Sequence, residues 1–494
     1  MFKPNYEQFA ELAEQGNVIP VCQEYLADLE TPVSVLSRFA DDEQVFLLES
    51  VEGGERWGRY SFLGINPYAI FTVENGKPYL RKGDQVTELD AKDGAMLALR
   101  QVMKDIRYAP LPGLPPLLGG AIGYIGYETV GEFEKLPPPK SPLHEPTACF
   151  MLTDEMIVFD NVRHTVIVSV CVHPADHPDL RTGYVHACNR INAISKVLRA
   201  PAPGIGESPV GIEQPELKSN MTRDEFYRMI KRAKQYITDG DIIQVVLSQR
   251  FSTRLMTKPL QLYRALRLIN PSPYTFFLKF GSRQLVGSSP EVMVRLDGSR
   301  AELRPIAGTR RRGKTEQEDI QLADELLSDE KERAEHLMLV DLGRNDLGRV
   351  ATPASVQVKE FMTIERYSHV MHIVSHVESV LADGKDCFDL LKATFPAGTL
   401  SGAPKIRAME IINELEPGPR GIYGGAVGYF SYSHNMDMAI TIRTLVIDGD
   451  TISVQAGGGD VYDSDPEKEY QETINKATAV FKAIELAAKG LELV

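Results

Sequence analysis

The sequence predicts an α+β protein built on antiparallel β-structure, and three observations support this fold class. Up to about residue 200, short runs rich in β-branched and aromatic residues alternate with turn-forming residues. This pattern is typical of antiparallel strands rather than of parallel βαβ units. The turn Asp448-Gly449-Asp450 separates two further β-like runs and predicts a hairpin. Several segments carry apolar residues at helical spacing, so helices are expected to cover the sheet.

Before residue 200, five strand-like runs and two helices are expected. They are strands over 44–50, 60–64, 68–74, 149–161 and 165–172, a helix over 95–106, and a helix that ends at residue 200. Residues 201–217 (PAPGIGESPVGIEQPEL) are rich in Pro, Gly and Glu without apolar periodicity, and this composition indicates a linker. The linker divides the chain into an N-terminal region, 1–200, and a C-terminal domain, 218–494.

The signals are clearer after the linker. Thr222 and Glu225 form a capping box that begins a helix, and Gly240 ends that helix. Strands are expected over 242–253, 274–280, 285–296, 426–433, 441–447 and 451–456. Helices are expected over 316–340, 384–393 and 404–415, and a last helix begins near Pro466, a proline of the N1 type.

The composition excludes several classes of protein. The chain has 494 residues, 54 Lys and Arg against 68 Asp and Glu, and a formal net charge of −14. This balance argues against a nucleic-acid binder, which needs a basic face. No apolar run approaches the roughly 20 residues that span a bilayer, and the N-terminus lacks the apolar core of a secretory signal. Five scattered cysteines without a CxxC pair argue against a disulfide framework and favour a reducing cytoplasm.

Two pairs of glutamates have i,i+3 spacing on expected helices. Glu332 and Glu335 form one pair, Glu469 and Glu472 the other, and each spacing puts two carboxylates on one helical face. Lys476 follows Glu469 by about two turns and joins that stripe. Acidic residues near a helix start are favoured by the helix dipole and usually face water. The alternative is a site for Mg²⁺, which takes oxygen ligands; the lack of His and Cys disfavours zinc.

Three glycine-rich turns form a second candidate group: PIAGT (305–309), PAGTLSGAPK (396–405) and QAGGGD (455–460). Glycines let backbone N–H groups approach an anion, and a helix N-terminus after the second turn adds its dipole. None of the three matches a dinucleotide-binding or P-loop motif, so no nucleotide is implied. Ordinary tight turns explain each of them equally well.

Three further features of the sequence can each be explained either by a structural role or by a functional one. Arg443 interrupts the apolar run MAITIRTLVI, where strand alternation would place it on one face with Thr441 and Leu445. Either a buried salt bridge or a substrate carboxylate would compensate for its charge. His372 lies among apolar residues, where a histidine is more often part of the core than a catalyst. The basic run TRRRGK (309–314) indicates a solvated loop in a chain this acidic.

As an ordered set, the motifs are similar to those of the chorismate-utilising enzymes, and more narrowly to the anthranilate synthase component I subfamily. The motifs are GDIIQVVLSQRF, NPSPYTFF, GSSPE, RPIAGTRRRG, ERAEHLMLVDLGRNDLG, MHIVSHV, PAGTLSGAPK, YGGAVGYF, IRTL, AGGG and DSDPEKEYQET. LLES (47–50) and RWGRYSFLG (56–64) extend the resemblance over nearly the whole chain. The resemblance implies two antiparallel sheets packed face to face with helices outside, and an enzyme that turns chorismate and ammonia into anthranilate, pyruvate and water.

The resemblance also implies a role for each candidate residue. It implies Mg²⁺ ligands at Glu332, Glu335, Glu469 and Glu472, a general acid at Glu291, assistance in pyruvate elimination at His372, and substrate contacts at Gly308, Thr309, Thr399, Tyr423, Arg443, Gly457, Gly459 and Lys476. Arg443 and Tyr423 are expected at the enolpyruvyl carboxylate. Mg²⁺ is expected to clamp the ring carboxylate and to help the C4 hydroxyl leave.

Two positions select the reaction within the family. Members that add water place a lysine base at the position of Gln244, and a glutamine cannot take up a proton. Aminodeoxychorismate synthases read PIKGT where this chain has Ala307, so a covalent lysine adduct cannot form. The rival functions are an aminodeoxychorismate or aminodeoxyisochorismate synthase and a non-catalytic tryptophan-sensing subunit. The presence of His372, Glu291 and the four glutamates argues against arrest at an intermediate and against loss of catalysis.

Two partners follow from the same resemblance. None of the five cysteines lies in the GxCxG-type elbow of a glutaminase, so a separate glutamine amidotransferase subunit is expected to supply ammonia, in a heterotetramer. The family's inhibitory tryptophan site maps to Glu49, Ser50, Pro273, Tyr274, Thr275, Val427 and Tyr429. Thr275 departs from the methionine that many relatives carry. Feedback inhibition by tryptophan is therefore expected, with its strength open.

Overall fold

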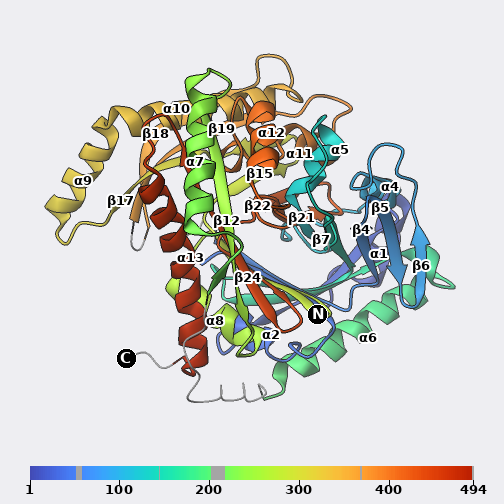
Figure 1. Ribbon diagram of the computed structural model, residues 1–494. Coiled ribbons are helices and arrows are strands. Elements are labelled where there is room, and N and C mark those ends of the chain that lie inside the picture. The colour runs from blue at the N-terminus through green and yellow to red at the C-terminus, as the bar shows by residue number, and fades with distance from the viewer. Residues whose placement is uncertain (52–57, 144, 202–216, 368–369, 492–494) are drawn as a thin grey trace.

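Two large antiparallel sheets form the centre of the molecule (Figure 1). The computed structural model describes residues 1–51, 58–143, 145–201, 217–367 and 370–491, so nearly all of the linker predicted at 201–217 lies outside the described residues. Each sheet has 12 strands and combines strands from before and after that linker. The predicted α+β class with two antiparallel sheets is confirmed.

The strand orders show how the two halves of the sequence interleave. Across the first sheet the strands are β1 (Ile19–Leu26), β10 (Thr165–Val172), β9 (Glu155–Asp160), β3 (Tyr60–Ile65), β2 (Gln44–Glu49), β13 (Tyr274–Phe280), β14 (Arg283–Ser289), β23 (Thr444–Asp448), β24 (Thr451–Asp460), β12 (Gln244–Arg254) and β11 (Lys218–Ser219), with β20 (Gly402–Ala403) paired to β12. Across the second they are β17 (Ile306–Arg311), β19 (Val370–Val380), β16 (Arg300–Leu303), β15 (Val292–Asp297), β22 (Met436–Ile440), β21 (Ala426–Ser431), β7 (Gly120–Ile125), β8 (Ala148–Thr153), β4 (Ala69–Glu74), β5 (Lys77–Lys82) and β6 (Gln85–Glu88), with β18 (Gln357–Arg366) paired to β19.

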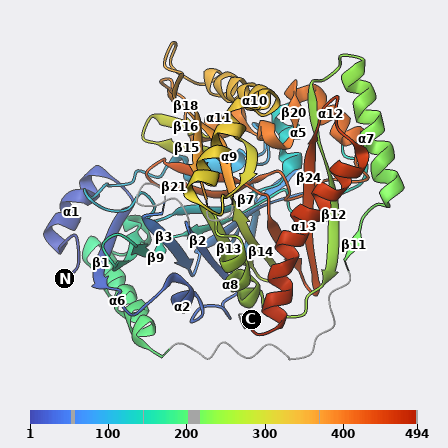
Figure 2. The same cartoon turned by 90° about the vertical axis from the view of Figure 1, so that its left-hand side faces the viewer.

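Helices surround the sheets (Figure 2). They are α1 (Tyr6–Gln15), α2 (Pro32–Leu36), α4 (Ala98–Lys104), α5 (Val130–Phe133), α6 (Leu180–Arg199), α7 (Arg223–Thr238), α8 (Pro259–Ile269), α9 (Glu316–Ser328), α10 (Glu330–Gly348), α11 (Cys387–Thr394), α12 (Lys405–Leu415) and α13 (Pro466–Ala488), with short 3₁₀ turns η1 (Tyr127–Thr129), η2 (Pro174–Asp176) and η3 (Gly398–Leu400). Within the described ranges, no helix combines the length and the apolar character needed to cross a membrane.

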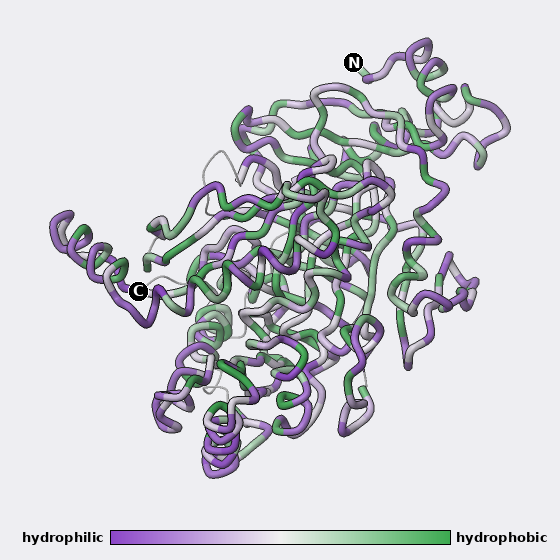
Figure 3. Tube along the Cα trace, turned by 90° about the horizontal axis from the view of Figure 1, so that it is seen from above, coloured by the Kyte–Doolittle hydropathy of each residue, from purple (hydrophilic) through white to green (hydrophobic). Residues whose placement is uncertain are grey.

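Three hydrophobic clusters hold these layers together. One lies between the sheets, where Phe46 and Phe276 of the first sheet meet Ile122 and Tyr429 of the second. A second packs α6, α8 and α13 on the outer face of the first sheet, and a third packs α4, α10 and α11 on the outer face of the second. Hydrophilic residues accordingly concentrate at the periphery (Figure 3). Both sheets are buried on two faces, which explains strands such as β8 and β10 with almost no exposed position.

Three runs that the sequence presents as single strands each contain two strands in different sheets. Residues 149–161 divide into β8 and β9, and residues 285–296 divide into β14 and β15 with Pro290 between them. Proline has no N–H to donate to a ladder and therefore favours such a break. The run around Arg443 divides into β22 and β23, and Arg443 itself lies between them with φ of 50°. The prediction that Arg443 shares a strand face with Thr441 and Leu445 is wrong.

The helix predictions are confirmed in part. The capping box of Thr222 begins α7 as predicted, and Asp465 caps α13 just before Pro466. The single helix expected over 316–340 is wrong, because α9 and α10 meet at Asp329. The carboxylate of Asp329 accepts hydrogen bonds from the backbone N–H groups of the first turn of α10, so it begins a new helix where apolar periodicity alone suggests continuation.

The basic run 309–314 is not a solvated loop. Part of it belongs to β17, and its three arginines form ion pairs with acidic residues of the following helices. The pairs are Arg310 with Asp329 and Glu332, Arg311 with Glu318, and Arg312 with Asp319. The charge of the run is therefore neutralised locally.

Candidate active site

A cavity of about 280 Å³ brings most of the predicted site residues together. It is lined by β12 and β24 of the first sheet, β17 and β19 of the second, and side chains of α10 and α13. The predicted residues in its lining are Gln244, Glu291, Thr309, Glu335, His372, Thr399, Tyr423, Arg443, Gly457, Gly459, Glu472 and Lys476. Gly308, Glu332 and Glu469 are not part of the lining. Gly308 lies between Ala307 and Thr309, which are, and each glutamate lies three residues before a glutamate that is.

Glu291 enters the cavity from the crossover between β14 and β15. Its Oε1 accepts a hydrogen bond from the Thr399 hydroxyl at 3.0 Å. Desolvation raises the pKa of Glu291 to about 8, although that hydrogen bond and the charge of Arg443 act in the opposite direction. At pH 7 the carboxyl is therefore mostly protonated. A neutral carboxylic acid in a cavity is suited to donate a proton to a leaving group.

His372 faces the same cavity from β19. Its Nδ1 lies 2.9 Å from the carbonyl oxygen of Gly308 and 3.1 Å from the Thr309 hydroxyl. A carbonyl only accepts, so Nδ1 carries the hydrogen in the contact with Gly308, and Nε2 keeps its lone pair. Burial lowers the pKa of His372, so the ring is neutral at pH 7. Gly308 reaches the ring through a bulge in β17, where its φ of 67° favours glycine.

Arg443 is the cation of the cavity on the side of Glu291. In the described part of the chain, its guanidinium forms no ion pair with a carboxylate, and burial lowers its pKa. Of the two compensations that the sequence leaves open, the buried salt bridge is therefore not found. A left-handed backbone conformation for a non-glycine residue is itself unfavourable. The strained backbone of Arg443 and its buried charge without an ion-pair partner together indicate that this side chain binds an anionic ligand.

Gln244 and Lys476 connect the cavity wall to the glutamates. Gln244 donates from Nε2 to Glu335 Oε1 at 3.3 Å. Lys476 donates to the carbonyl of Gly457 at 2.9 Å and pairs with Glu472 at 2.7 Å. The two glutamate-bearing helices therefore meet the strands of the first sheet at one end of the cavity.

The four glutamates supply the donor type that suits a hard divalent cation. Burial raises the pKa of Glu335 and of Glu469, and neighbouring carboxylates, including Glu332 and Glu472, raise them further. Glycines leave room for two of the carboxylates, since a side chain at Gly308 or Gly458 would come within 3.1 Å of Glu332 or 2.9 Å of Glu469. Clustered carboxylate oxygens are the ligands that Mg²⁺ prefers.

The glutamates are not yet arranged as a complete ligand set. Among the described residues, no three of them bring possible ligand atoms within 4.8 Å of one another. Glu332 is paired with Arg310 at 3.2 Å and Glu472 with Lys476 at 2.7 Å. Binding a cation therefore requires side-chain rotations that exchange these ion pairs for metal contacts.

Asp460 is a residue at this site that the sequence reasoning missed. It ends β24 and is 1% exposed. The glycine-rich turn predicted at 455–460 is wrong, because these residues continue β24 and pair with β12. Neither carboxylate oxygen has a side-chain hydrogen-bond partner among the described residues. Burial raises its pKa well above the usual range, and Glu469 and Glu472 add to the effect. The acidic residue at the end of the glycine-rich run 455–460 was the available signal.

Arg420 is a second residue that was missed. It is 2% exposed, and its guanidinium pairs with Glu416 at 2.6 Å. It also donates to the carbonyl oxygens of Leu400 and Val246, both at 2.6 Å. Since Leu400 and Val246 line the cavity, Arg420 fixes the backbone behind it. The surrounding PGPRG sequence looks like an ordinary turn, so only the tertiary structure identifies this role.

We expect Arg420→Met to lower the free energy of unfolding by about 3–5 kcal/mol, because it leaves the buried Glu416 carboxylate without a cation in the described chain, with only the hydrogen bonds from Ser248. Urea denaturation followed by circular dichroism measures the change. The double variant with Glu416→Gln is the control and should recover part of the loss, since it removes the orphaned charge. A loss below about 1 kcal/mol in the single variant would contradict the assignment.

A second, smaller pocket of about 80 Å³ lies between the sheets and contains all seven residues of the expected tryptophan site. Glu49, Ser50, Pro273, Tyr274 and Thr275 come from the first-sheet side, and Val427 and Tyr429 from β21 of the second sheet. The Tyr274 hydroxyl donates to Asp437 at 2.9 Å, which joins the two sheets at the pocket wall. Asp437, Tyr60 and Phe62 also line it and were missed by the sequence reasoning.

Comparisons with known proteins agree with this geometry. Residues 43–482 match the family model described as chorismate binding enzyme. The chain is 49% identical to anthranilate synthase component 1 of Synechocystis sp. over 98% of this chain and 99% of that protein. It is 46% identical to the same component of Acetivibrio thermocellus over 99% of this chain and all of that protein.

Solved structures agree as well. Anthranilate synthase component I from Streptococcus pneumoniae superposes with a TM-score of 0.78 at 37% identity, covering 92% of this chain and 99% of that one. The menaquinone-specific isochorismate synthase of Escherichia coli has a TM-score of 0.71 at 19% identity, which shows a shared fold. The chain belongs to the chorismate-binding enzymes. Within that family, the full-length relatives named above are anthranilate synthase components I, and the resemblance seen in the motifs is confirmed.

Proposed function

We propose that the cavity converts chorismate and ammonia into anthranilate, pyruvate and water, as a Mg²⁺-dependent lyase. The observation that carries the proposal is the pairing, in one cavity, of a protonated carboxyl at Glu291 with a neutral imidazole at His372. The reaction needs a proton donor for the departing hydroxyl and a group that assists the later loss of pyruvate. A carboxyl that keeps its proton and an imidazole that stays neutral are suited to these two steps.

The residues around this pair account for substrate placement. Arg443 and Tyr423 are proposed to hold the enolpyruvyl carboxylate, because Arg443 is the buried guanidinium that lacks a carboxylate partner in the described chain. Glu291 then donates its proton to the C4 hydroxyl. His372 keeps its Nε2 lone pair available, since Nδ1–H is held by Gly308. Thr399 orients Glu291 through its hydroxyl.

The choice of nucleophile follows from what the cavity lacks. Gln244 cannot act as a base toward water, and its amide is held by Glu335. Ala307 lines the cavity where a lysine adduct would require an amine. These two residues support direct addition of ammonia over addition of water and over a route through a covalent lysine adduct. When bound at the four glutamates, Mg²⁺ would neutralise the ring carboxylate and polarise the departing hydroxyl.

We also propose a separate glutaminase subunit as the source of ammonia. Glutamine hydrolysis by the cysteine route needs a thiolate, and burial raises the pKa of all five cysteines, to about 11 at Cys22 and about 12 at Cys387. None of them is suited to act as that nucleophile. The 80 Å³ pocket is proposed to bind tryptophan, which would inhibit the enzyme. The enzyme is proposed to act in the cytoplasm.

The test is to incubate the purified chain with chorismate, Mg²⁺ and ammonium at mildly alkaline pH and to follow anthranilate by fluorescence. We expect anthranilate without any partner subunit, loss of the signal with EDTA, and suppression by tryptophan. A Glu49→Gln variant should keep activity and lose tryptophan sensitivity. Isochorismate as the product would contradict the role assigned to Gln244, and an aminated diene would contradict the role assigned to His372. If the folded protein consumes no chorismate, the result would favour a regulatory subunit.

A further inference from the structure

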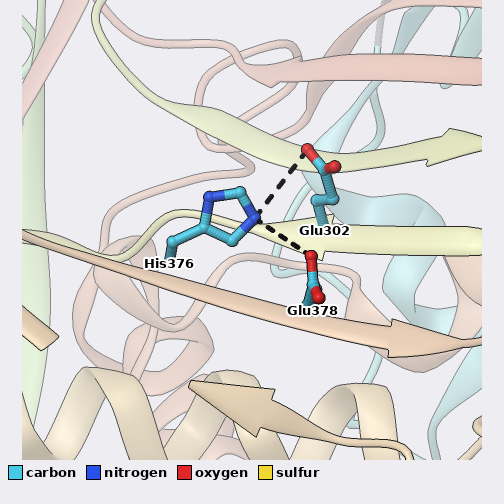
Figure 4. A group of neighbouring side chains, drawn as sticks. All are labelled: Glu302, His376 and Glu378. Carbon is cyan, nitrogen blue, oxygen red and sulfur yellow. Dashed lines mark ion pairs between the residues drawn. The ribbon is translucent and has the colours of Figure 1, made fainter. Parts of the chain in front are cut away.

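A buried group of two carboxylates and one imidazole lies on the second sheet, apart from the four glutamates of the active site. Glu302 is on β16, and His376 and Glu378 are on the neighbouring strand β19. Glu302 is the antiparallel partner of Glu378, and His376 is two residues from Glu378, so all three share one face of the sheet. Figure 4 shows the imidazole facing both carboxylates.

The distances within this group fit a bound cation better than hydrogen bonds. Nε2 of His376 lies 4.0 Å from Glu302 Oε2 and 3.9 Å from Glu378 Oε2. Both separations exceed the length of a hydrogen bond. One possible ligand atom from each residue lies within 4.8 Å of the others, and in the described ranges this is the only trio of His, Cys, Asp and Glu that does so. Ligand bonds of about 2.0–2.2 Å would need small inward shifts.

Burial and outer contacts prepare the two carboxylates for a ligand role. Glu302 and His376 are each 3% exposed. Arg300 pairs with Oε1 of Glu302 at 2.5 Å, and Lys359 pairs with Oε1 of Glu378 at 3.0 Å. Each cation holds one oxygen, and the other oxygen of each carboxylate is the one nearest His376. Such outer contacts orient metal-binding carboxylates in known sites.

The neighbouring cations do not cancel the attraction for a metal ion. Arg295, the partner of Glu302 on β15, has its strongest charge interaction with Asp437. The side chains of Arg300 and Lys359 are 55% and 49% exposed, so water screens much of their charge. The carboxylate of Glu302 is almost fully buried, so water screens its negative charge much less. A further carboxylate is near in the sheet register, since Glu360 of β18 is the partner of His376.

We propose that Glu302, His376 and Glu378 bind a divalent transition-metal ion, with Zn²⁺ as the best match, and water or Glu360 at the fourth position. Imidazole nitrogen with carboxylate oxygens suits Zn²⁺, whereas Mg²⁺ prefers oxygen ligands alone. The ion would bridge β16 and β19, the strand that also carries His372, and so stabilise one wall of the active-site cavity. The proposal does not depend on the reaction assigned to that cavity.

The first experiment titrates Zn²⁺ into the metal-stripped full chain, with a chromogenic chelator as competitor and millimolar Mg²⁺ present throughout. Mg²⁺ in excess competes with Zn²⁺ for the glutamates of the active cavity. We expect one tight Zn²⁺ per chain, and at least 100-fold weaker binding in His376→Ala, since loss of a mere outer contact already costs 10–100-fold in metal affinity. Co²⁺ in place of Zn²⁺ should give a visible spectrum typical of low coordination number, and the variant should lose it.

The matched control is His186→Ala, an exposed position on α6 whose ring lies 5.3 Å from that of His177. This surface pair is the competing histidine site, and its loss should leave the tight Zn²⁺ unchanged. Zn²⁺ should also raise the melting temperature of the wild type and not that of His376→Ala. If His376→Ala does not fold, the same measurements use Glu378→Gln. Equal Zn²⁺ affinity in wild type and variants, or loss only in His186→Ala, would overturn the proposal.

Discussion

Glu291→Gln is expected to lower kcat/KM for anthranilate formation by roughly 10³-fold, within the 10²–10⁴-fold range typical of a general acid. The amide keeps the size of the side chain and an oxygen that accepts the hydrogen bond from Thr399. It has no acidic proton to give to the departing hydroxyl. Activity would be measured by fluorescence with saturating Mg²⁺ and ammonium, and bound substrate by equilibrium titration, which should change little.

The pH profile separates proton donation from a merely structural role. Because the pKa of Glu291 is raised to about 8, wild-type activity should fall tenfold per pH unit above that value, at a fixed concentration of free ammonia. Thr399→Val removes a hydrogen bond that lowers this pKa, so the alkaline limb should move to higher pH. The residual activity of Glu291→Gln should lack the limb. A limb that persists in this variant would assign the proton to another group.

The same substitution should not destabilise the protein. The unfolded carboxyl ionises near pH 4.5, whereas the folded one keeps its proton to about pH 8, so the folded state binds more protons in this window. Stability from this group is therefore greatest at low pH and is lost as the pH rises through that window. Glutamine does not ionise in either state. Glu291→Gln should thus be at least as stable as the wild type at pH 8 in urea denaturation.

Local sequence signals located the helices better than the strands of the sheets. The capping box of Thr222 and the proline at 466 describe contacts within one turn, and the structure confirms both. Strand periodicity reports which residues are apolar but not which sheet a strand joins. For that reason the crossovers at Glu291 and Arg443 were concealed inside continuous apolar runs. Both residues reach the cavity because the chain passes there from one sheet to the other.

Most candidate site residues came from the resemblance in the motifs rather than from spacing alone. From spacing, the glutamate pairs on α10 and α13 were equally compatible with a solvated helix start. Their relation across one cavity depends on tertiary packing, since the two pairs are more than 130 positions apart in the sequence. Arg420 was missed for the same reason, since its role depends on the carbonyl oxygen of Val246, 174 positions away. Asp460 was missed because strand spacing does not show that its carboxylate is buried near Glu469 and Glu472.

Arg443→Asn is expected to raise KM for chorismate roughly 100-fold without loss of stability. Charge-assisted hydrogen bonds to a carboxylate contribute about 1.5–3 kcal/mol each, and their loss in a closed cavity accounts for this factor. Asparagine tolerates the left-handed conformation at φ of 50° better than other side chains. It also removes a buried charge that has no ion-pair partner in the described chain, so the melting temperature should stay the same or rise.

Arg420 provides the contrast that makes this result interpretable. Both arginines are buried near the cavity, but Arg420 is paired with Glu416 and its loss should cost stability, whereas the loss of Arg443 should cost substrate affinity. A protein keeps a strained, uncompensated cation in its interior at the expense of stability only where a ligand supplies the missing charge. If Arg443→Asn lowers stability by more than about 2 kcal/mol and leaves KM unchanged, the guanidinium is a structural element and the carboxylate of the substrate binds elsewhere.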